Sequence, residues 1–129
     1  MNTPTRNKNI YIIDDDESVC RALKIFLMTF DFDVKTFNSA VNFFDTVSND
    51  DPGCLLLDIY MPGMDGWAVQ KRLITSGSKR PVIFISAENP DTVEDRALKA
   101  GAAGFFQKPV NGQLLVEMIN EKGSIEASL

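Results

Sequence analysis

The feature that most constrains the fold of this chain is a five-fold alternation of short apolar runs with longer amphipathic stretches. The apolar runs are rich in β-branched and aromatic residues, which is typical of buried strands. The stretches between them carry apolar residues at helical spacing, as Val19, Leu23 and Phe26 do. We predict strands over 10–13, 34–37, 54–57, 81–85 and 104–106, and helices over 17–30, 40–48, 67–76, 90–100 and 112–121.

Regular alternation of strand and helix indicates an α/β fold, because neighbouring parallel strands need long crossover connections. The pattern therefore predicts a three-layer (βα)5 architecture, a doubly wound parallel five-stranded sheet with helices on both faces. The run from Cys54 to Leu57 is apolar throughout, as expected of a strand buried on both faces. The length of 129 residues fits one domain, which we place at 8–122. Residues 123–129 would be a short C-terminal tail or the start of a linker.

The composition excludes several classes of function. The chain contains no histidine, which removes His-based triads, His metal sites and a role as phosphohistidine donor. The two cysteines, Cys20 and Cys54, are too few for a zinc site or a disulfide framework. Cys54 lies in an apolar run, so we expect a buried free thiol there and a reducing, cytoplasmic setting.

Charge and hydropathy narrow the choice of partners. Acidic residues outnumber basic ones by 18 to 13, which disfavours direct nucleic-acid binding by this domain. No apolar run approaches the roughly 20 residues needed to span a bilayer, so no membrane association is expected. The N-terminal stretch Met1–Asn9 is polar, and we expect no secretory signal.

Chemistry-bearing side chains follow four of the predicted strands, at the edge where open parallel sheets bind ligands. The strand ends carry Asp14-Asp15-Asp16-Glu17, Asp58, Ser86-Ala87 and Gln107-Lys108-Pro109. Clustered carboxylates need a compensating cation, and without histidine or paired cysteines Mg²⁺ is the natural choice. A carboxylate beside Mg²⁺, a lysine and a hydroxyl matches the requirements of phosphoryl transfer, with an aspartyl-phosphate as the covalent species.

Four segments, in order along the chain, carry a family resemblance. They are Asp14-Asp15, Leu56-Leu57-Asp58-Ile59-Tyr60-Met61-Pro62-Gly63-Met64-Asp65-Gly66, Ile85-Ser86-Ala87 and Gly101-Ala102-Ala103-Gly104-Phe105-Phe106-Gln107-Lys108-Pro109. Over residues 8–122 the chain resembles the receiver domain of a bacterial two-component response regulator, especially receivers that precede a helix-turn-helix output domain. The resemblance implies a flavodoxin-like sheet in the order 2-1-3-4-5. It also implies a signalling domain rather than an enzyme, one that catalyses only its own phosphorylation and dephosphorylation.

The resemblance assigns roles at the acidic site. Asp58 would accept a phosphoryl group from the phosphohistidine of a sensor histidine kinase or phosphotransfer protein. Asp15 would bind Mg²⁺ directly and Asp14 mainly through water, with Asp58 and the Tyr60 carbonyl completing the protein ligands. Lys108 would pair with Asp58 and then with the phosphoryl oxygens, and the Lys108-Pro109 peptide would be cis.

The resemblance also assigns a switch. Ser86 and the Ala87 N–H would bind the phosphoryl group, and Phe105 would turn inward when Ser86 moves. Tyr60 and Glu88 would tune the access of water, and we expect the bulky Tyr60 to slow self-dephosphorylation. The output surface would comprise the fourth helix, fifth strand and fifth helix, which could bind a partner or form a homodimer.

Each residue also has a plainer interpretation. The consecutive acids Asp14, Asp15 and Asp16 could simply cap the first helix. Ser86 could be a strand-end hydroxyl bonded to backbone, and Lys108 a solvated surface lysine. Phe105 could be core, as we expect of Trp67 and Met64, and we expect Asp65 to cap a helix.

Two other classes of function remain as alternatives. A haloacid-dehalogenase-like phosphatase also uses an aspartyl-phosphate, but it needs a second Asp two residues after the nucleophile, where Tyr60 stands. A receiver-like module used only for binding would have a broken acidic site, and this one is intact. Dinucleotide-binding and P-loop enzymes are disfavoured because neither glycine-rich motif follows the first strand.

Overall fold

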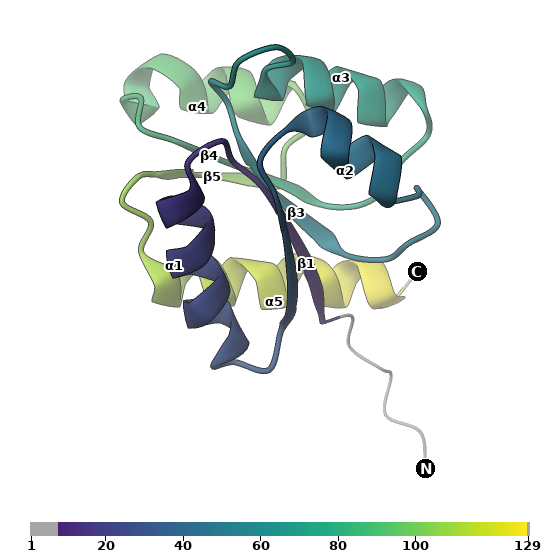
Figure 1. Cartoon of the computed structure of the whole chain (residues 1–129), viewed down its shortest axis with the longest axis vertical. Coiled ribbons are helices and arrows are strands. Elements are labelled where there is room, and N and C mark those ends of the chain that lie inside the picture. The colour runs from purple at the N-terminus through teal and green to yellow at the C-terminus, as the bar shows by residue number, and fades with distance from the viewer. Residues whose placement is uncertain (1–7, 129) are drawn as a thin grey trace.

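Five strands and five helices alternate along the chain in the computed structural model, which describes residues 8–128, with side chains through 122 (Figure 1). The strands are β1 (Asn9–Ile13), β2 (Asp33–Phe37), β3 (Cys54–Asp58), β4 (Val82–Ser86) and β5 (Gly104–Gln107). The helices are α1 (Glu17–Met28), α2 (Ala40–Thr46), α3 (Gly66–Thr75), α4 (Pro90–Lys99) and α5 (Gly112–Ser128). All strand pairs are parallel, in the order β2-β1-β3-β4-β5, so the predicted fold and strand order are confirmed. The polar N-terminal stretch lies outside the described residues except for Lys8 and Asn9.

Three predicted helix ends are wrong by two residues or more. The second helix was expected to reach residue 48 but ends at Thr46, because the backbone becomes extended at Val47. The first helix was expected to reach residue 30 but ends at Met28, because Asp31 adopts a left-handed conformation with φ of 66°. Phe30 keeps the apolar spacing while lying in the turn, where its ring meets Phe26 at a centroid distance of 5.1 Å. The last helix was expected to end at 121 but continues to Ser128. Gly123 costs a helix only about 1 kcal/mol, which does not end it.

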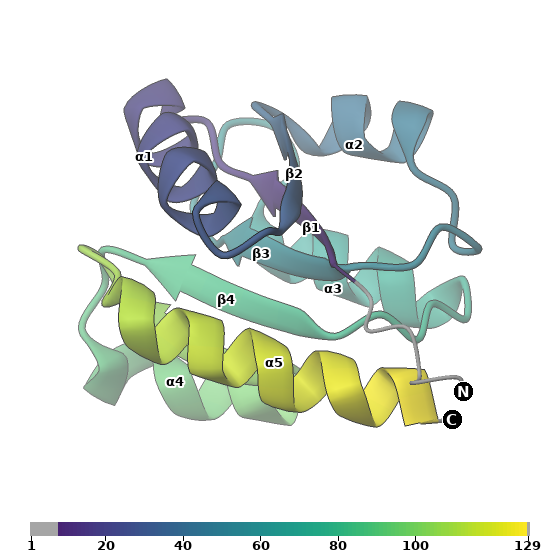
Figure 2. The same cartoon turned by 90° about the horizontal axis from the view of Figure 1, so that it is seen from below.

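The sheet is covered on both faces, which gives three layers. Helices α2, α3 and α4 pack on one face, and α1 and α5 pack on the other (Figure 1). Seen from below, α5 lies in the foreground and runs along β4 (Figure 2). Alternate residues of β1 point to opposite faces of the sheet, as the two-residue period of a strand requires. Tyr11 and Ile13 belong to the core under α2, α3 and α4, and Ile10 and Ile12 belong to the core under α1 and α5.

The central strands and the cysteines are buried as predicted. Every residue of β3 and β4 is buried, since both strands have neighbours on either side and helices on either face. The side chains of Cys20 and Cys54 are both buried, which confirms the burial expected at position 54.

Five helices begin at side chains that cap them. In each case a side-chain oxygen accepts a backbone N–H from the first turn, which satisfies a donor that the helix itself leaves unpaired. The capping residues are Asp16, Ser39, Asp65, Asn89 and Asn111. The cap predicted at Asp65 is therefore confirmed.

Gly66 brings the start of α3 against the end of β3. A Cβ atom on Gly66 would lie 2.5 Å from the Asp58 carbonyl oxygen and 2.8 Å from the Ile59 Cα. The Gly66 N–H donates to the Ile59 carbonyl at 2.6 Å. Because the obstacle is backbone rather than a flexible side chain, only glycine lets α3 pack this closely on the strand that carries Asp58.

We predict that Gly66→Ala lowers the free energy of unfolding by about 2–3 kcal/mol, because the added methyl group overpacks rigid backbone. Gly63→Ala is the matched control in the same loop, with φ of 81° and nothing within 4 Å of an added Cβ. That variant should lose only about 1 kcal/mol, from backbone conformation alone. Urea unfolding measures both losses, and hydrogen exchange at residue 66 should accelerate in Gly66→Ala only. Equal losses and unchanged exchange would contradict the steric explanation.

Candidate functional site

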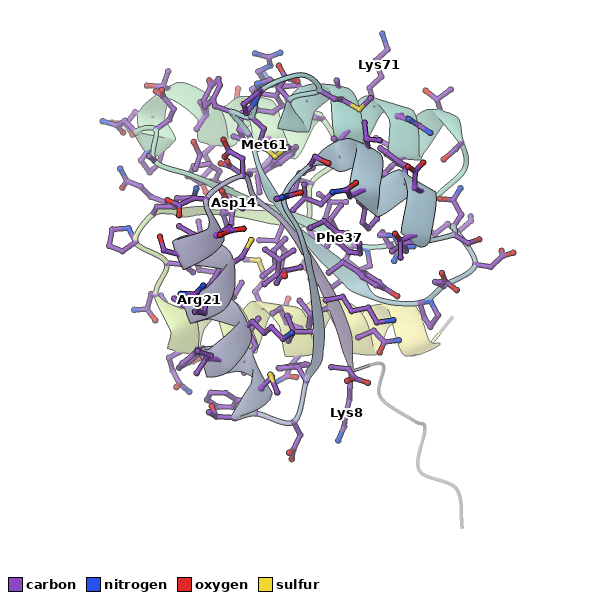
Figure 3. All side chains as sticks on the ribbon, in the orientation of Figure 1. Lys8, Asp14, Arg21, Phe37, Met61 and Lys71 are labelled. Carbon is purple, nitrogen blue, oxygen red and sulfur yellow. The ribbon has the colours of Figure 1, made fainter. Side chains whose placement is uncertain are left out.

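The candidate site lies where the direction of chain winding reverses. From β1 the chain passes to β2 on one side and then returns to β3 on the other, so β1 and β3 are neighbours at the centre of the sheet. Ligands of open α/β sheets bind at such a point, beyond the carboxyl ends of the strands. Asp14 follows β1 directly, and Asp58 is the last residue of β3. Figure 3 labels Asp14 at this edge, near Met61, which lies in the loop after β3.

Three carboxylates meet at this edge. Oxygen atoms of Asp14, Asp15 and Asp58 all lie within 4.8 Å of one another. Asp14 is 0% exposed and Asp58 is 5% exposed, whereas Asp15 is exposed to solvent. The three consecutive acids thus divide between two tasks, because Asp16 caps α1 through the backbone N–H groups of Ser18 and Val19.

Lys108 supplies the positive charge of the cluster. Its Nζ lies 2.8 Å from Asp14 Oδ2 and donates a hydrogen bond to Asp58 Oδ1 at 3.3 Å. The Lys108 side chain is only 19% exposed, so the solvated-lysine interpretation does not hold. The Lys108-Pro109 peptide is cis, as predicted.

The cluster fits a hard divalent cation. Asp14 Oδ1 accepts the Asp16 N–H at 2.9 Å, but the buried Oδ2 has no hydrogen bond of acceptable geometry and touches only the Lys108 ammonium. Three carboxylates facing one ammonium leave two negative charges when all are ionised. An all-oxygen set that combines two buried carboxylates with an exposed one suits Mg²⁺, which keeps several waters.

The electrostatics of the cluster make Asp58 unusual. Burial and then the Asp14 charge raise the pKa of Asp58 to about 7, although Lys108 acts in the opposite direction. Burial by itself lowers the pKa of Lys108, but hydrogen bonding and charge from Asp14 and Asp58 outweigh burial and raise it overall. Near neutral pH the lysine is therefore charged, while burial and the Asp14 charge favour the protonated form of Asp58 more than that of a solvated carboxyl.

The ends of β4 and β5 are tied to this cluster. Ser86 is 1% exposed, and its carbonyl accepts the Lys108 N–H at 2.8 Å. Its Oγ accepts the Glu88 N–H at 3.1 Å, so the hydroxyl bonds to backbone as the plainer interpretation expected. Phe105 is 8% exposed and belongs to the core under α2, α3 and α4, in register with Phe84 of β4. The ring thus faces inward.

Other residues of the expected site stay at the surface. Tyr60 is 52% exposed, and Ala87 and Glu88 are exposed. The roles expected of Tyr60 and Glu88 at the site therefore remain predictions.

Cys20 and Gly66 support the site, and the sequence did not reveal either role. The Cys20 thiol donates to the Asp14 carbonyl at 3.4 Å. Burial raises the pKa of this thiol to about 11, so it stays protonated and can donate. The spacing of Cys20, Leu23 and Leu27 on the buried face of α1 was the available signal, and it predicts burial without naming the partner.

This fold, with acids at the switch point and a lysine from the β5–α5 loop, defines a phospho-accepting signalling domain. Residues 10–120 match the family described as the response regulator receiver domain. The chain belongs to this family, whose members act in two-component signalling and generally bind Mg²⁺ at an acidic pocket. Receivers of response regulators interact with histidine kinases or phosphotransfer proteins.

Relatives point to transcription regulators. Response regulator protein TmoT of Ectopseudomonas mendocina is 41% identical over 110 residues, 85% of this chain and 50% of TmoT. Transcriptional regulatory protein FixJ of Bradyrhizobium diazoefficiens is 32% identical over 115 residues, 89% of this chain and 56% of FixJ. The chain thus spans about half the length of the curated relatives it matches.

Solved structures agree with the fold. The response regulator StyR superposes with a TM-score of 0.85 at 35% identity, covering 93% of this chain and 61% of StyR. The structure titled FixJ-N superposes with a TM-score of 0.84 at 28% identity, covering 93% of this chain and 96% of FixJ-N.

Among the described residues, no helix has the length and apolar character required to cross a bilayer.

We predict that Asp58→Asn stabilises the metal-free protein at pH 8. The folded-state pKa is raised above the unfolded value of about 4, so the folded state binds more protons and stability falls as pH rises from about 4 to about 7. The amide removes this loss, and the gain at pH 8 should be on the order of 1–2 kcal/mol.

Unfolding in EDTA at pH 5 and pH 8 measures the effect, with Asp45→Asn on the exposed surface of α2 as the control. Added Mg²⁺ should stabilise the unsubstituted protein at pH 8 more than it stabilises Asp58→Asn. A pH dependence that is the same in all three proteins would contradict the assignment to Asp58.

Proposed function

We propose that Asp58 accepts a phosphoryl group from the phosphohistidine of a sensor histidine kinase or a phosphotransfer protein. The observation that carries this proposal is the position of the Asp58 carboxylate, at the end of β3 and 3.3 Å from Lys108 Nζ. The neighbouring carboxylates of Asp14 and Asp15 form the acidic pocket that receivers use for Mg²⁺.

The transfer begins with attack by an Asp58 oxygen on the phosphorus atom. The phosphorus–nitrogen bond breaks, its electron pair stays on the donor imidazole, and an acyl phosphate forms on Asp58. The attacking carboxyl must be ionised, which its raised pKa opposes until a cation offsets the Asp14 charge. When bound, Mg²⁺ neutralises charge on the phosphoryl oxygens, and Asp14, Asp15, Asp58 and the Tyr60 carbonyl would hold it.

Lys108 follows the negative charge as it moves. In the unphosphorylated site its ammonium contacts Asp14 and Asp58, and it would turn to a phosphoryl oxygen once Asp58 is esterified. Ser86 Oγ and the Ala87 N–H would bind another oxygen. The bond from the Lys108 N–H to the Ser86 carbonyl holds these two strand ends together, which supports their joint response.

Phosphorylation then acts as a population shift. It adds about −1.5 to −2 charge at the strand ends and favours the arrangement in which Ser86 meets the phosphoryl group and Phe105 lies inward. The affected surface would comprise α4, β5 and α5, which would bind a partner or a second copy of the chain.

We propose that residues 8–122 are the receiver of a transcription regulator, as in FixJ and TmoT, and that any DNA contact lies outside them. The two buried cysteine side chains favour a cytoplasmic location.

Intact mass after incubation with Mg²⁺ and acetyl phosphate tests the function. The unsubstituted protein and Asp45→Ala should each gain one phosphoryl group, and Asp58→Ala should gain none. A folded protein that gains nothing would point to a binding-only module. Rapid consumption of acetyl phosphate without an adduct would point to a phosphatase.

We predict that Tyr60→Asn shortens the half-life of the acyl phosphate about three-fold or more, because a small polar side chain admits water where the phenol ring hinders it. Tyr60→Phe keeps the bulk of the ring and should leave the half-life unchanged. The decay of the phosphorylated mass after donor removal measures both. A half-life in Tyr60→Asn equal to that of the unsubstituted protein would refute this role.

A further inference from the structure

Trp67, the only tryptophan of the chain, joins the sheet to α4. It is the second residue of α3 and is half-buried. Its ring lies against Phe84 of β4, with the ring centroids 5.1 Å apart. The guanidinium carbon of Arg96, on α4, lies 4.1 Å from the centroid of the Trp67 ring. A cation at that distance over an indole is attracted by the ring, so one side chain contacts both the sheet and α4.

The inner end of this contact reaches the expected switch. Phe84 is in register with Phe105 on the neighbouring strand, and both belong to the core under α3 and α4. Residues in register on adjacent strands point to the same face about 4.8 Å apart. Phe105 turned inward therefore supports Phe84, and Phe84 supports Trp67.

The rest of the attachment of α4 is small. Only Val93 and Ala97 of this helix are buried. The Gln70 amide also donates to the Ala100 carbonyl at the end of α4, at 3.0 Å. The Arg96 stack therefore adds to an attachment in which two side chains of α4 are buried.

The α3–α4 interface also contains unsatisfied polar atoms. Trp67 Nε1 and Gln70 Oε1 are buried and have no hydrogen-bond partner in the described part of the chain. A buried donor and acceptor left unpaired weaken the arrangement that buries them. The interface is therefore poised, because a shift of α4 that admits water would satisfy both groups.

We propose that Trp67 is a positioning residue that relays the position of the Phe105 ring to α4, and that the Trp67–Arg96 stack holds α4 in the arrangement with Phe105 inward. This inference rests on the proposed phosphorylation of Asp58. Phosphorylation favours the inward ring, the inward ring backs Trp67 through Phe84, and Trp67 then presents its face to Arg96. Loss of the stack should make both the inward arrangement and phosphorylation less favourable.

Arg96→Ala tests the stack, and Lys99→Ala is its matched control. The Lys99→Ala substitution removes the same charge from the same helix as Arg96→Ala. Lys99 itself pairs with Asp95, and both side chains are largely exposed. With acetyl phosphate and Mg²⁺, Arg96→Ala should be phosphorylated about three-fold more slowly, and Lys99→Ala at the unsubstituted rate. Arg96→Lys, which keeps the charge without the planar group, should fall between them. Urea midpoints establish that each variant is folded.

Acrylamide quenching of Trp67 fluorescence reports the relay itself. Phosphorylation should lower the quenching constant about two-fold in the unsubstituted protein, as the stack covers the indole more fully. Phe105→Leu, which keeps an apolar core residue, should still gain the phosphoryl mass but lose this change. Arg96→Ala should show a higher constant before and after phosphorylation.

The outcomes separate the two proposals. A phosphoryl mass gain with unchanged Trp67 quenching, or equal rates in Arg96→Ala and Lys99→Ala, overturns the relay and leaves the phosphorylation standing. A faster rate in Arg96→Ala overturns the assignment of the stack to the inward arrangement. No mass gain in the unsubstituted protein overturns the phosphorylation and the relay together.

Discussion

The close burial of two carboxylates beside a single ammonium is the interaction on which the site depends. Asp14 and Asp58 stand at the ends of adjacent central strands, so the strand order itself forces them together. Their repulsion is tolerable because Lys108 reaches both of them from the loop after β5. Removing Lys108 would leave two buried carboxylates without a compensating charge, which is more costly than the cluster itself. The excess of negative charge that destabilises the fold also makes the site suited to a divalent cation and a phosphoryl group.

The helices on the two faces of the sheet are attached in different ways. Helices α1 and α5 pack a continuous apolar core against one face, and Cys20 there ties α1 to the backbone of Asp14. On the other face α4 contributes few buried residues and relies on contacts from α3. In the proposed function, this difference would let a local change in charge move α4 without unfolding the other elements.

The sequence predicted the architecture because five apolar runs at regular spacing admit few other folds, and strand ends converge whatever the loops do. On that ground Asp58 and Lys108 could be placed at the same edge of the sheet, whereas their pairing was implied by the family resemblance. The separate roles of the three consecutive acids could not be predicted from their spacing. These roles depend on where the strand ends and the helix begins, which decides the acid that caps the helix. The end of the first helix was predicted too late because the apolar spacing continues through Phe30 into the turn. The contact of Trp67 with Arg96 was missed because periodicity predicts which face of a helix is buried, but not its neighbour.

The raised pKa of Asp58 makes protons and divalent cations competitors for the same oxygen atoms. Where such cations are scarce, the carboxyl carries a proton for much of the time near neutral pH and is a poor nucleophile, whatever reactive phosphate compounds surround it. Where they are plentiful, a bound cation would favour the ionised carboxylate that the proposed transfer requires. The readiness of the site for that transfer would therefore depend on the ionic composition of the surrounding solution before any partner arrives.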